Sequence, residues 1–310
     1  DSTELKPNEY QIRVKGNPVA RGELQAKNLL AIDPGYAEEP IEGIEAIDPV
    51  FGLPARWISP SLREKAELLG YNVVEPVEVL ATHLTEIINN HAHELLGRQE
   101  TQHLIDELKN VYPAVVEELI PDPVSISTLQ RVLQNLLIER VPIRDLRSIL
   151  ETLADYGHID DIEVLSEYVR TALRRQICNM LLRESPEGGI SVLTVDGMVE
   201  ELIKEAVQST PAGIAVALAP DMAADLFQQM AGLIDQMMAN GQQPVVLAAP
   251  HIRLAFRKLT AANFPSLHVL SYNEIAPEVE VASVGNIALS YENQEVRSAE
   301  YAGSPATSTR

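Results

Sequence analysis

Histidines, paired carboxylates and one thiol are the side chains in this sequence that could do chemistry, and their spacing restricts what that chemistry could be. His91 and His93 lie two residues apart on a predicted helix, about 200° around its axis, so one metal ion cannot reach both. His83 precedes His91 on roughly the same helix face, but no third ligand accompanies these two residues. We therefore predict no metal site, and histidines that are solvated or partly buried.

The sequence contains none of the common catalytic or nucleotide-binding signatures. It has no glycine-rich phosphate loop, no GxGxxG after a strand and no GxSxG elbow. The acidic stretch HIDDIE (158–163) lacks the oxygen spacing and the central glycine of an EF-hand loop. Carboxylate pairs such as Glu117-Glu118 and Glu200-Glu201 are predicted to solvate helix surfaces. We predict that the protein is not an enzyme and has no cofactor.

The composition is that of an acidic globular protein. The 310 residues include 45 acidic and 24 basic ones, and the net charge of −21 repels phosphate backbones, which argues against a nucleic-acid partner. The single cysteine, Cys178, lies in an apolar-periodic stretch, so we expect a buried structural thiol and a reducing compartment. The longest apolar run, 212–220, is about half of what a bilayer span requires. We expect a soluble cytoplasmic polypeptide that is part of something larger.

Strands and helices alternate in the first third of the chain, which indicates a small α/β layer. Proline in the first turn and glycine at the end mark each predicted helix. The predicted strands are 10–16, 28–33, 55–59 and 71–76, and the predicted helices are 59–70 and 76–97.

The middle third is predicted to be helical. Ser127 is a plausible N-cap for a first helix, and Val141-Pro142 ends that helix and begins the next. A third helix is expected from about Glu163 to Leu182. The inward face of the second helix is predicted to be Ile143, Leu146, Ile149, Leu150 and Leu153.

The last third predicts a second, separate α/β domain with parallel strand pairs, because apolar strands alternate there with amphipathic helices. After about Leu289 the pattern ends, and we expect a disordered tail. The predicted strands are contained in ISVLTVDG, GIAVALAP, QPVVLAAP and LHVLSY.

Residues 46–60, AIDPVFGLPARWISP, place Phe51 on a turn flanked by proline and glycine. A large apolar ring at such a position either fills a small core or forms the floor of a docking site. The residues alone leave both interpretations open.

Several motifs in this sequence resemble the FlhA family, the large export-gate proteins of flagellar type III secretion, grouped as FHIPEP, LcrD and InvA. The resemblance runs from about Tyr10 to Asn286 and is looser in the last α/β domain. The motifs are IDPVFGLPARWI (47–58), VLATHLTEII (79–88), ELLGRQETQ (94–102) and LQRVLQNLLIERVPIRDLRSILETLADYG (129–157).

This resemblance implies a fold of class α/β plus α with several subdomains. The first subdomain is split and N-terminally truncated, the second is inserted into it, a helical subdomain follows, and an α/β subdomain ends the fold. The expected boundaries are 1–26 with 76–95, 27–75, 96–175 and 176–287, followed by a tail at 288–310.

The resemblance also implies partners and a location. They are flagellar export chaperones carrying late substrates, components of the export ATPase complex, other gate subunits, and further copies of the chain in a nonameric ring. The expected location is the cytoplasmic face of the bacterial inner membrane, with membrane contact only through an absent N-terminal half.

A chaperone-docking dimple is implied between the first two subdomains, which favours the docking interpretation of Phe51 and leaves Trp57 in the core. Asp48 and Thr82 are expected at its rim. Its apolar wall is expected to be Ile32, Pro34, Phe51, Leu53, Val74 and Val79.

Two alternatives remain. One is the export gate of a non-flagellar injectisome. The other is a cytoplasmic regulator that uses the helices around Pro142 as a DNA-binding helix-turn-helix, although Asp145, Glu151 and Asp155 beside Arg144 and Arg147 disfavour DNA.

Overall fold

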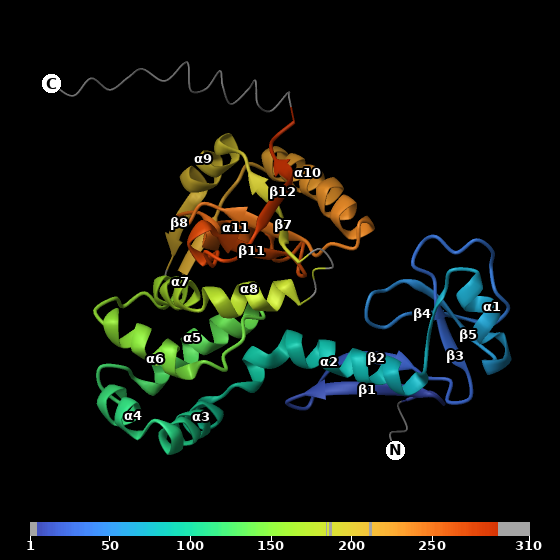
Figure 1. The fold of residues 1–310 in the computed structure, drawn as a ribbon, viewed down its shortest axis with the longest axis horizontal. Helices are drawn as coiled ribbons and strands as arrows, with labels where there is room; N and C mark the ends of the chain where they lie inside the picture. Colours follow the sequence, from blue (N-terminus) through green and yellow to red (C-terminus); the bar gives the residue numbers. More distant parts are fainter. Residues whose placement is uncertain (1–4, 184, 186–187, 211–212, 291–310) are drawn as a thin grey trace. The chain divides into compact units, whose positions relative to one another are not determined.

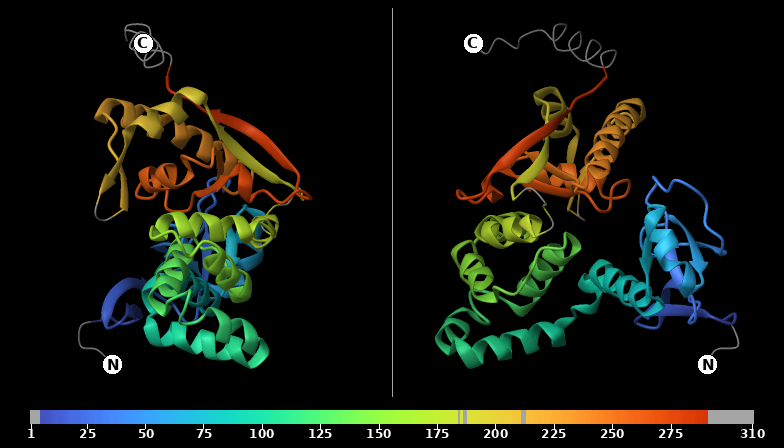
Figure 2. Two further views of the ribbon diagram at one scale, coloured as in Figure 1. Left: turned by 90° about the vertical axis from the view of Figure 1, so that its left-hand side faces the viewer. Right: turned by 45° about the vertical axis from the view of Figure 1, so that its right-hand side comes forward.

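The computed structural model describes residues 5–183, 185, 188–210 and 213–290. The chain divides into two compact units, Asp1–Thr101 and Gln102–Arg310, and the division falls within helix α3 (Arg98–Val111). Figures 1 and 2 show the elements of each unit. The predicted tail at 288–310 lies outside the described residues from 291 onward. Its first residues are part of the fold, because Leu289 is buried and the Ser290 amide donates to Asp225 at 2.8 Å.

The first unit begins with a β-hairpin that packs against a long helix. Strands β1 (Glu9–Val14) and β2 (Asn17–Glu23) are antiparallel and joined by Lys15 and Gly16, both with positive φ, as two-residue hairpin turns require. Helix α2 (Pro76–Leu95) runs along this hairpin (Figure 1). Strand β1 and helix α2 were predicted, whereas β2 was not, because its polar residues show no clear apolar alternation.

A four-stranded antiparallel sheet forms the rest of the first unit. Its order is β4-β5-β3-β6, so β4 (Ile44–Ile47) lies at one edge, with Ile44 and Ile47 exposed on either side of Glu45. This edge strand was missed by the sequence prediction. The remaining elements are β3 (Leu29–Ile32), β5 (Pro54–Ile58), η1 (Pro60–Leu62), α1 (Arg63–Leu68) and β6 (Asn72–Val74).

Both faces of this sheet are covered, and strand β3 shows why. Leu29 and Ala31 belong to a hydrophobic cluster that includes Ala66 of α1, whereas the alternate residues of β3 belong to another that includes Val79 of α2. Because successive strand residues point to opposite faces, α1 and α2 cover the two sides. All four residues of β3 are therefore buried.

The second unit starts with a helical group whose N-caps determine the ends of the helices. Ser125, rather than Ser127, caps α5 by accepting from the Thr128 amide at 3.0 Å. Asp145 caps α6, so this helix begins after Pro142 and excludes the half-buried Ile143 from its buried face. These helices are α4 (Pro113–Leu119), α5 (Ile126–Ile138), α6 (Leu146–Asp155), α7 (Ile162–Ala172) and α8 (Arg174–Leu182).

The predicted third helix is two helices, because the chain leaves helical geometry at Leu173 between α7 and α8. Leu173 is fully buried, so the break places an apolar side chain in the core. Arg147 of α6 pairs with Glu151 at 2.8 Å and lies 5.3 Å from the Tyr112 ring centroid. Its guanidinium is thus engaged within the fold, which weakens the helix-turn-helix alternative.

The second unit ends in a four-stranded parallel sheet of order β11-β10-β7-β12. Strand β12 (Val281–Ile287) was missed. The predicted strand in GIAVALAP is β9 (Gly213–Val216), which pairs only with β8 (Val207–Thr210) in an antiparallel hairpin, so its expected parallel pairing is wrong. The other elements are β7 (Ile190–Val195), α9 (Gly197–Ala206), α10 (Pro220–Ala239), β10 (Val245–Ala248), α11 (Arg253–Thr260), β11 (His268–Ser271) and η2 (Tyr272–Glu274).

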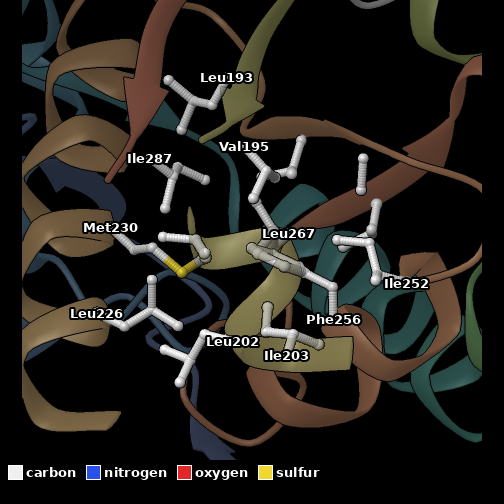
Figure 3. Close-up of a cluster of buried hydrophobic side chains, with 14 of the residues drawn as sticks. Leu193, Val195, Leu202, Ile203, Leu226, Met230, Ile252, Phe256, Leu267 and Ile287 are labelled. Atoms are coloured by element: carbon white, nitrogen blue, oxygen red, sulfur yellow. The ribbon is translucent and has the colours of Figure 1, made fainter. Parts of the chain in front are cut away.

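Figure 3 shows the hydrophobic core on one face of this sheet. Leu193 and Val195 of β7 point into it, and Phe256 of α11 and Met230 of α10 close it from the helical side. The other face of β7 contacts α8, where the Cys178 thiol is fully buried and donates to the Glu274 carbonyl at 3.3 Å. The predicted burial of Cys178 is thus confirmed.

A buried charge network joins the helical group to this sheet. The Arg253 side chain is 0% exposed, and its Nη1 lies 2.7 Å from Glu139 at the end of α5. The same guanidinium pairs with Glu167 of α7. Arg170 of α7 pairs in turn with Glu139 at 3.3 Å and with the buried Glu274 of η2. The two arginines thus hold three carboxylates that come from three different elements.

The network controls the ionisation of Glu139. Burial by itself raises the pKa of this carboxyl, but Arg170 and Arg253 outweigh burial and lower the pKa to about 2. Glu139 is therefore ionised throughout the physiological range. Its charge stabilises the fold only while both arginines remain beside it.

We expect Leu150→Ala to lower the free energy of unfolding by ~2–5 kcal/mol, because Leu150 is fully buried on α6 and its truncation leaves a cavity. Urea unfolding measures the change. Ile143→Ala is the matched control and should cost clearly less, since Ile143 is half-buried and outside the helix. Equal losses would show that the buried face is assigned incorrectly.

We expect Glu139→Gln to destabilise the fold by about 3 kcal/mol at pH 7, because two arginines lose a buried partner. The folded pKa of about 2 lies below the ordinary 4.5, so this stabilisation is present above pH 4.5 and is lost as the pH falls toward 2. Urea unfolding across this range should show the difference between parent and variant shrinking. Glu151→Gln, which removes an exposed pair with Arg147, should cost less than about 1 kcal/mol.

Candidate functional site

Phe51 stands on a tight turn in the first unit, and its ring is exposed. The Asp48 amide donates to the Leu53 carbonyl at 2.9 Å, and the Gly52 amide donates to the Asp48 carbonyl at 3.0 Å. Gly52 has φ of 69°, a left-handed conformation that glycine adopts without steric cost. The Phe51 side chain is 72% exposed, so it is not a core plug.

Asp48 holds this turn from beneath. It is only 3% exposed, and its Oδ2 accepts a hydrogen bond from the Phe51 amide at 2.6 Å. Its predicted place at an exposed rim is therefore wrong. The sequence signal was available, since an aspartate before Pro-X-X-Gly commonly accepts from backbone amides within its own turn.

The Asp48 carboxylate also faces two aromatic side chains that join the hairpin to α2. The Tyr10 hydroxyl is hydrogen-bonded to His83 Nδ1 at 2.7 Å. Burial, and next the nearby Asp48, raise the pKa of Tyr10. Burial lowers the pKa of His83 although Asp48 opposes that shift. The Phe51 turn is therefore anchored next to a buried polar cluster that includes β1 and α2.

The predicted apolar wall divides into interior and accessible residues. Ile32 and Val79 are buried in one cluster with Trp57, which confirms Trp57 as a core residue and places these two inside the core as well. Leu53 and Val74 pack against the same cluster and are only half-buried. The remaining predicted residues are Pro34, which is half-buried, and Thr82, which is exposed.

The structure adds apolar residues that sequence reasoning missed. Ile47, at the end of β4 and close to the turn in sequence, is 72% exposed. Helix α2 exposes a second row of apolar side chains, and their spacing of seven, four and seven residues places them on one face of the helix. That spacing could have been read from the sequence. The row is Val77, Leu84, Ile88 and Leu95.

The residues first considered for chemistry have structural roles. His91 pairs with Glu94 at 2.7 Å. Glu200 accepts from the Ala249 amide at 3.1 Å and so links α9 to the chain after β10, whereas Glu201 pairs with Lys204 on the surface.

Within the described residues no three side chains of His, Cys, Asp or Glu come together to hold a metal ion. No helix in this part of the chain is long and apolar enough to cross a membrane.

Solved structures share this fold. The Chlamydia pneumoniae CdsV protein superposes with a TM-score of 0.78 at 29% identity, covering 93% of this chain and 83% of CdsV. CdsV in its complex with CdsO superposes with a TM-score of 0.73 at 29% identity, covering 93% of this chain and 82% of that chain. The nonameric EPEC SctV-C superposes with a TM-score of 0.71 at 26% identity, covering 92% of this chain and 85% of SctV-C. The two units thus define a domain of the CdsV and SctV-C type.

Sequence comparison agrees with the fold. The chain belongs to the FHIPEP family, whose model matches residues 1–280. It is 45% identical over 286 residues to flagellar biosynthesis protein FlhA of Bacillus subtilis (strain 168), which covers 92% of this chain and 42% of that protein. FlhA of Escherichia coli (strain K12) is 37% identical over 288 residues, which covers 93% and 41%. The chain thus spans less than half the length of these relatives.

We expect Phe51→Ala to leave the melting temperature nearly unchanged, because the exposed ring contributes little burial. Asp48→Ala should cost ~1–3 kcal/mol, since it removes the acceptor of the Phe51 amide and leaves a buried site unfilled. Trp57→Ala should cost ~3–5 kcal/mol. Thermal melts of the three variants rank their losses of stability. A loss for Phe51→Ala as large as that for Trp57→Ala would contradict the exposed position of the Phe51 ring.

Proposed function

We propose that this chain is a non-catalytic docking platform of the flagellar type III protein export gate. Its first unit would receive export chaperones bound to late substrates. The observation that carries the proposal is Phe51, a 72% exposed aromatic ring on a turn that three hydrogen bonds hold in place. A rigid aromatic anchor of this kind binds a partner at small conformational cost.

The accessible residues around the turn describe the proposed docking surface. Ile47 and Phe51 provide exposed apolar area, and the half-buried Leu53 and Val74 lie at the surface of the cluster behind them. Thr82 on α2 adds an exposed hydroxyl. Ile32 and Val79 support this surface from the interior, and Asp48 contributes by holding the turn rather than by touching a partner.

The named relatives support a flagellar rather than an injectisome gate. The FlhA proteins are 45% and 37% identical to this chain, whereas the Chlamydia CdsV protein is 29% identical. The chain is also proposed to engage components of the export ATPase complex. CdsV, to which it is similar, has been solved together with a second protein, CdsO. The chain is proposed to assemble into a nonameric ring, as SctV-C does, at the cytoplasmic face of the inner membrane.

A binding experiment with matched variants tests the docking surface. We expect Phe51→Ala to weaken binding of a purified flagellar chaperone–filament-protein complex by roughly thirtyfold, because truncating a central aromatic anchor commonly costs ~2 kcal/mol. Isothermal titration calorimetry measures the dissociation constant. Ile47→Ala should weaken the same complex to a smaller extent.

Leu68→Ala is the control, because Leu68 is 85% exposed on α1 of the same unit but lies outside the proposed surface. It should bind like the parent. If Leu68→Ala and Phe51→Ala weakened binding equally, exposed apolar area in general would account for the contact. If neither changed it, the chaperone complex would dock elsewhere.

A further inference from the structure

A small cleft in the second unit is lined by more positive than negative side chains, in a chain whose net charge is −21. It lies between the end of α5 and strand β11. Its volume of about 20 Å³ is room for one small group. The charged or titratable lining residues are Glu139, Arg140, Arg170, Arg257 and His268.

One arginine of this lining, Arg257, has no carboxylate partner among the described residues. Glu139 and Arg170 belong to the buried charge network and pair with each other at 3.3 Å. The Arg257 guanidinium donates to the Leu267 carbonyl at 3.1 Å, and within the described residues it has no carboxylate partner. A half-buried guanidinium bonded only to a neutral carbonyl retains donors for an anion.

Arg140 reaches the cleft from a backbone position that disfavours arginine. The Val141 amide bonds to the Leu136 carbonyl at 2.9 Å and the Arg140 amide to the Leu137 carbonyl at 3.0 Å, which together form a Schellman motif at the end of α5. Arg140 occupies the position with φ of 58°, where glycine is usual. Left-handed backbone is strained at a residue with a Cβ. From this position Arg140 lines the cleft.

The ionisation of the neighbouring groups agrees with a positive potential in the cleft. Burial and next the nearby Arg140, Arg257 and Arg170 lower the pKa of His268 to about 4, although Glu139 opposes the shift. Burial lowers the pKa of Arg257, Glu139 opposes this shift, and the other arginines add to it. Any group that brings a negative charge into the cleft would reverse the part of these shifts that the arginines cause.

We propose that this cleft binds a single carboxylate, with Arg257 as its donor and the positive charge of Arg140 beside it. The room suits one planar group, and a guanidinium fork matches carboxylate geometry. Glu139 in the lining disfavours a doubly charged phosphate. Ile138, Met180 and Pro265 supply apolar walls that would contact the carbon chain carrying the carboxylate. The carboxylate comes either from a small free acid or from an acidic side chain of a protein segment.

Thermal melts in acetate and in chloride, at equal ionic strength and pH 7, test the site. Saturating acetate should raise the melting temperature of the parent by about 3 °C or more relative to chloride. Arg257→Gln should lose this rise. Arg175→Gln should keep it, because Arg175 pairs with Glu278 on the surface and does not line the cleft. An equal rise in all three proteins would overturn the proposal.

Arg140→Gly separates binding from folding. Glycine relieves the left-handed backbone, so in chloride the variant should melt within a few degrees of the parent, while the acetate-dependent rise disappears. A large loss of stability together with a preserved acetate rise would show that Arg140 acts only in the fold.

Nuclear magnetic resonance of the histidine side chains gives a local readout that does not depend on melting. Acetate bound in the cleft would lie beside His268. The imidazole signal of His268 should therefore move when acetate is added to the parent and stay fixed in Arg257→Gln. A blocked peptide with one internal glutamate then distinguishes the source: tighter binding than acetate indicates a protein segment, and equal binding indicates a small acid. A response to inorganic phosphate without one to acetate would refute a carboxylate site.

Discussion

The second unit depends on how a fully buried guanidinium is neutralised. Arg253 begins α11 in the α/β part, and the carboxylates that hold it come from α5 and α7 in the helical part. An unpaired charge at that depth would be strongly destabilising, so the two parts cannot separate without a large loss of free energy. This explains why residues 102–310 form one unit although their elements predict a helical domain followed by a separate α/β domain.

Local signals in the sequence predicted most elements, and long-range pairing decided the rest. The helices of the middle third and strands β3, β5, β7, β10 and β11 follow from periodicity and from proline or glycine at their ends. Strands β4 and β12 have weak alternation and are strands because β5 and β7 pair with them. The Arg253–Glu139 contact spans 114 residues, and no pattern in one sequence indicates it. The sequence placed the N-cap of α5 at Ser127 and the structure places it at Ser125, a two-residue difference that is usual at helix ends.

The candidate site was predicted in part. The proline and glycine around Phe51 indicated a turn, and family resemblance favoured an exposed ring, which the structure shows. The same resemblance named Ile32, Val79 and Asp48 without separating residues that form a surface from residues that support it. Strand β3 is covered on both faces, which buries Ile32, and the turn encloses Asp48 beneath Phe51. Burial of this kind depends on three-dimensional packing, so residue type and spacing alone could not predict it.

Strand β4 has a consequence for copies of the chain held close together. As an edge strand it leaves half of its backbone amides and carbonyls unpaired, and the exposed Ile44 and Ile47 would favour pairing with an identical edge. Glu45 lies between them and Glu42 just precedes the strand, so two such edges in antiparallel alignment would bring like charges together. The acidic residues thereby disfavour sheet-to-sheet pairing between copies of the chain, while leaving the edge open to a strand of opposite charge.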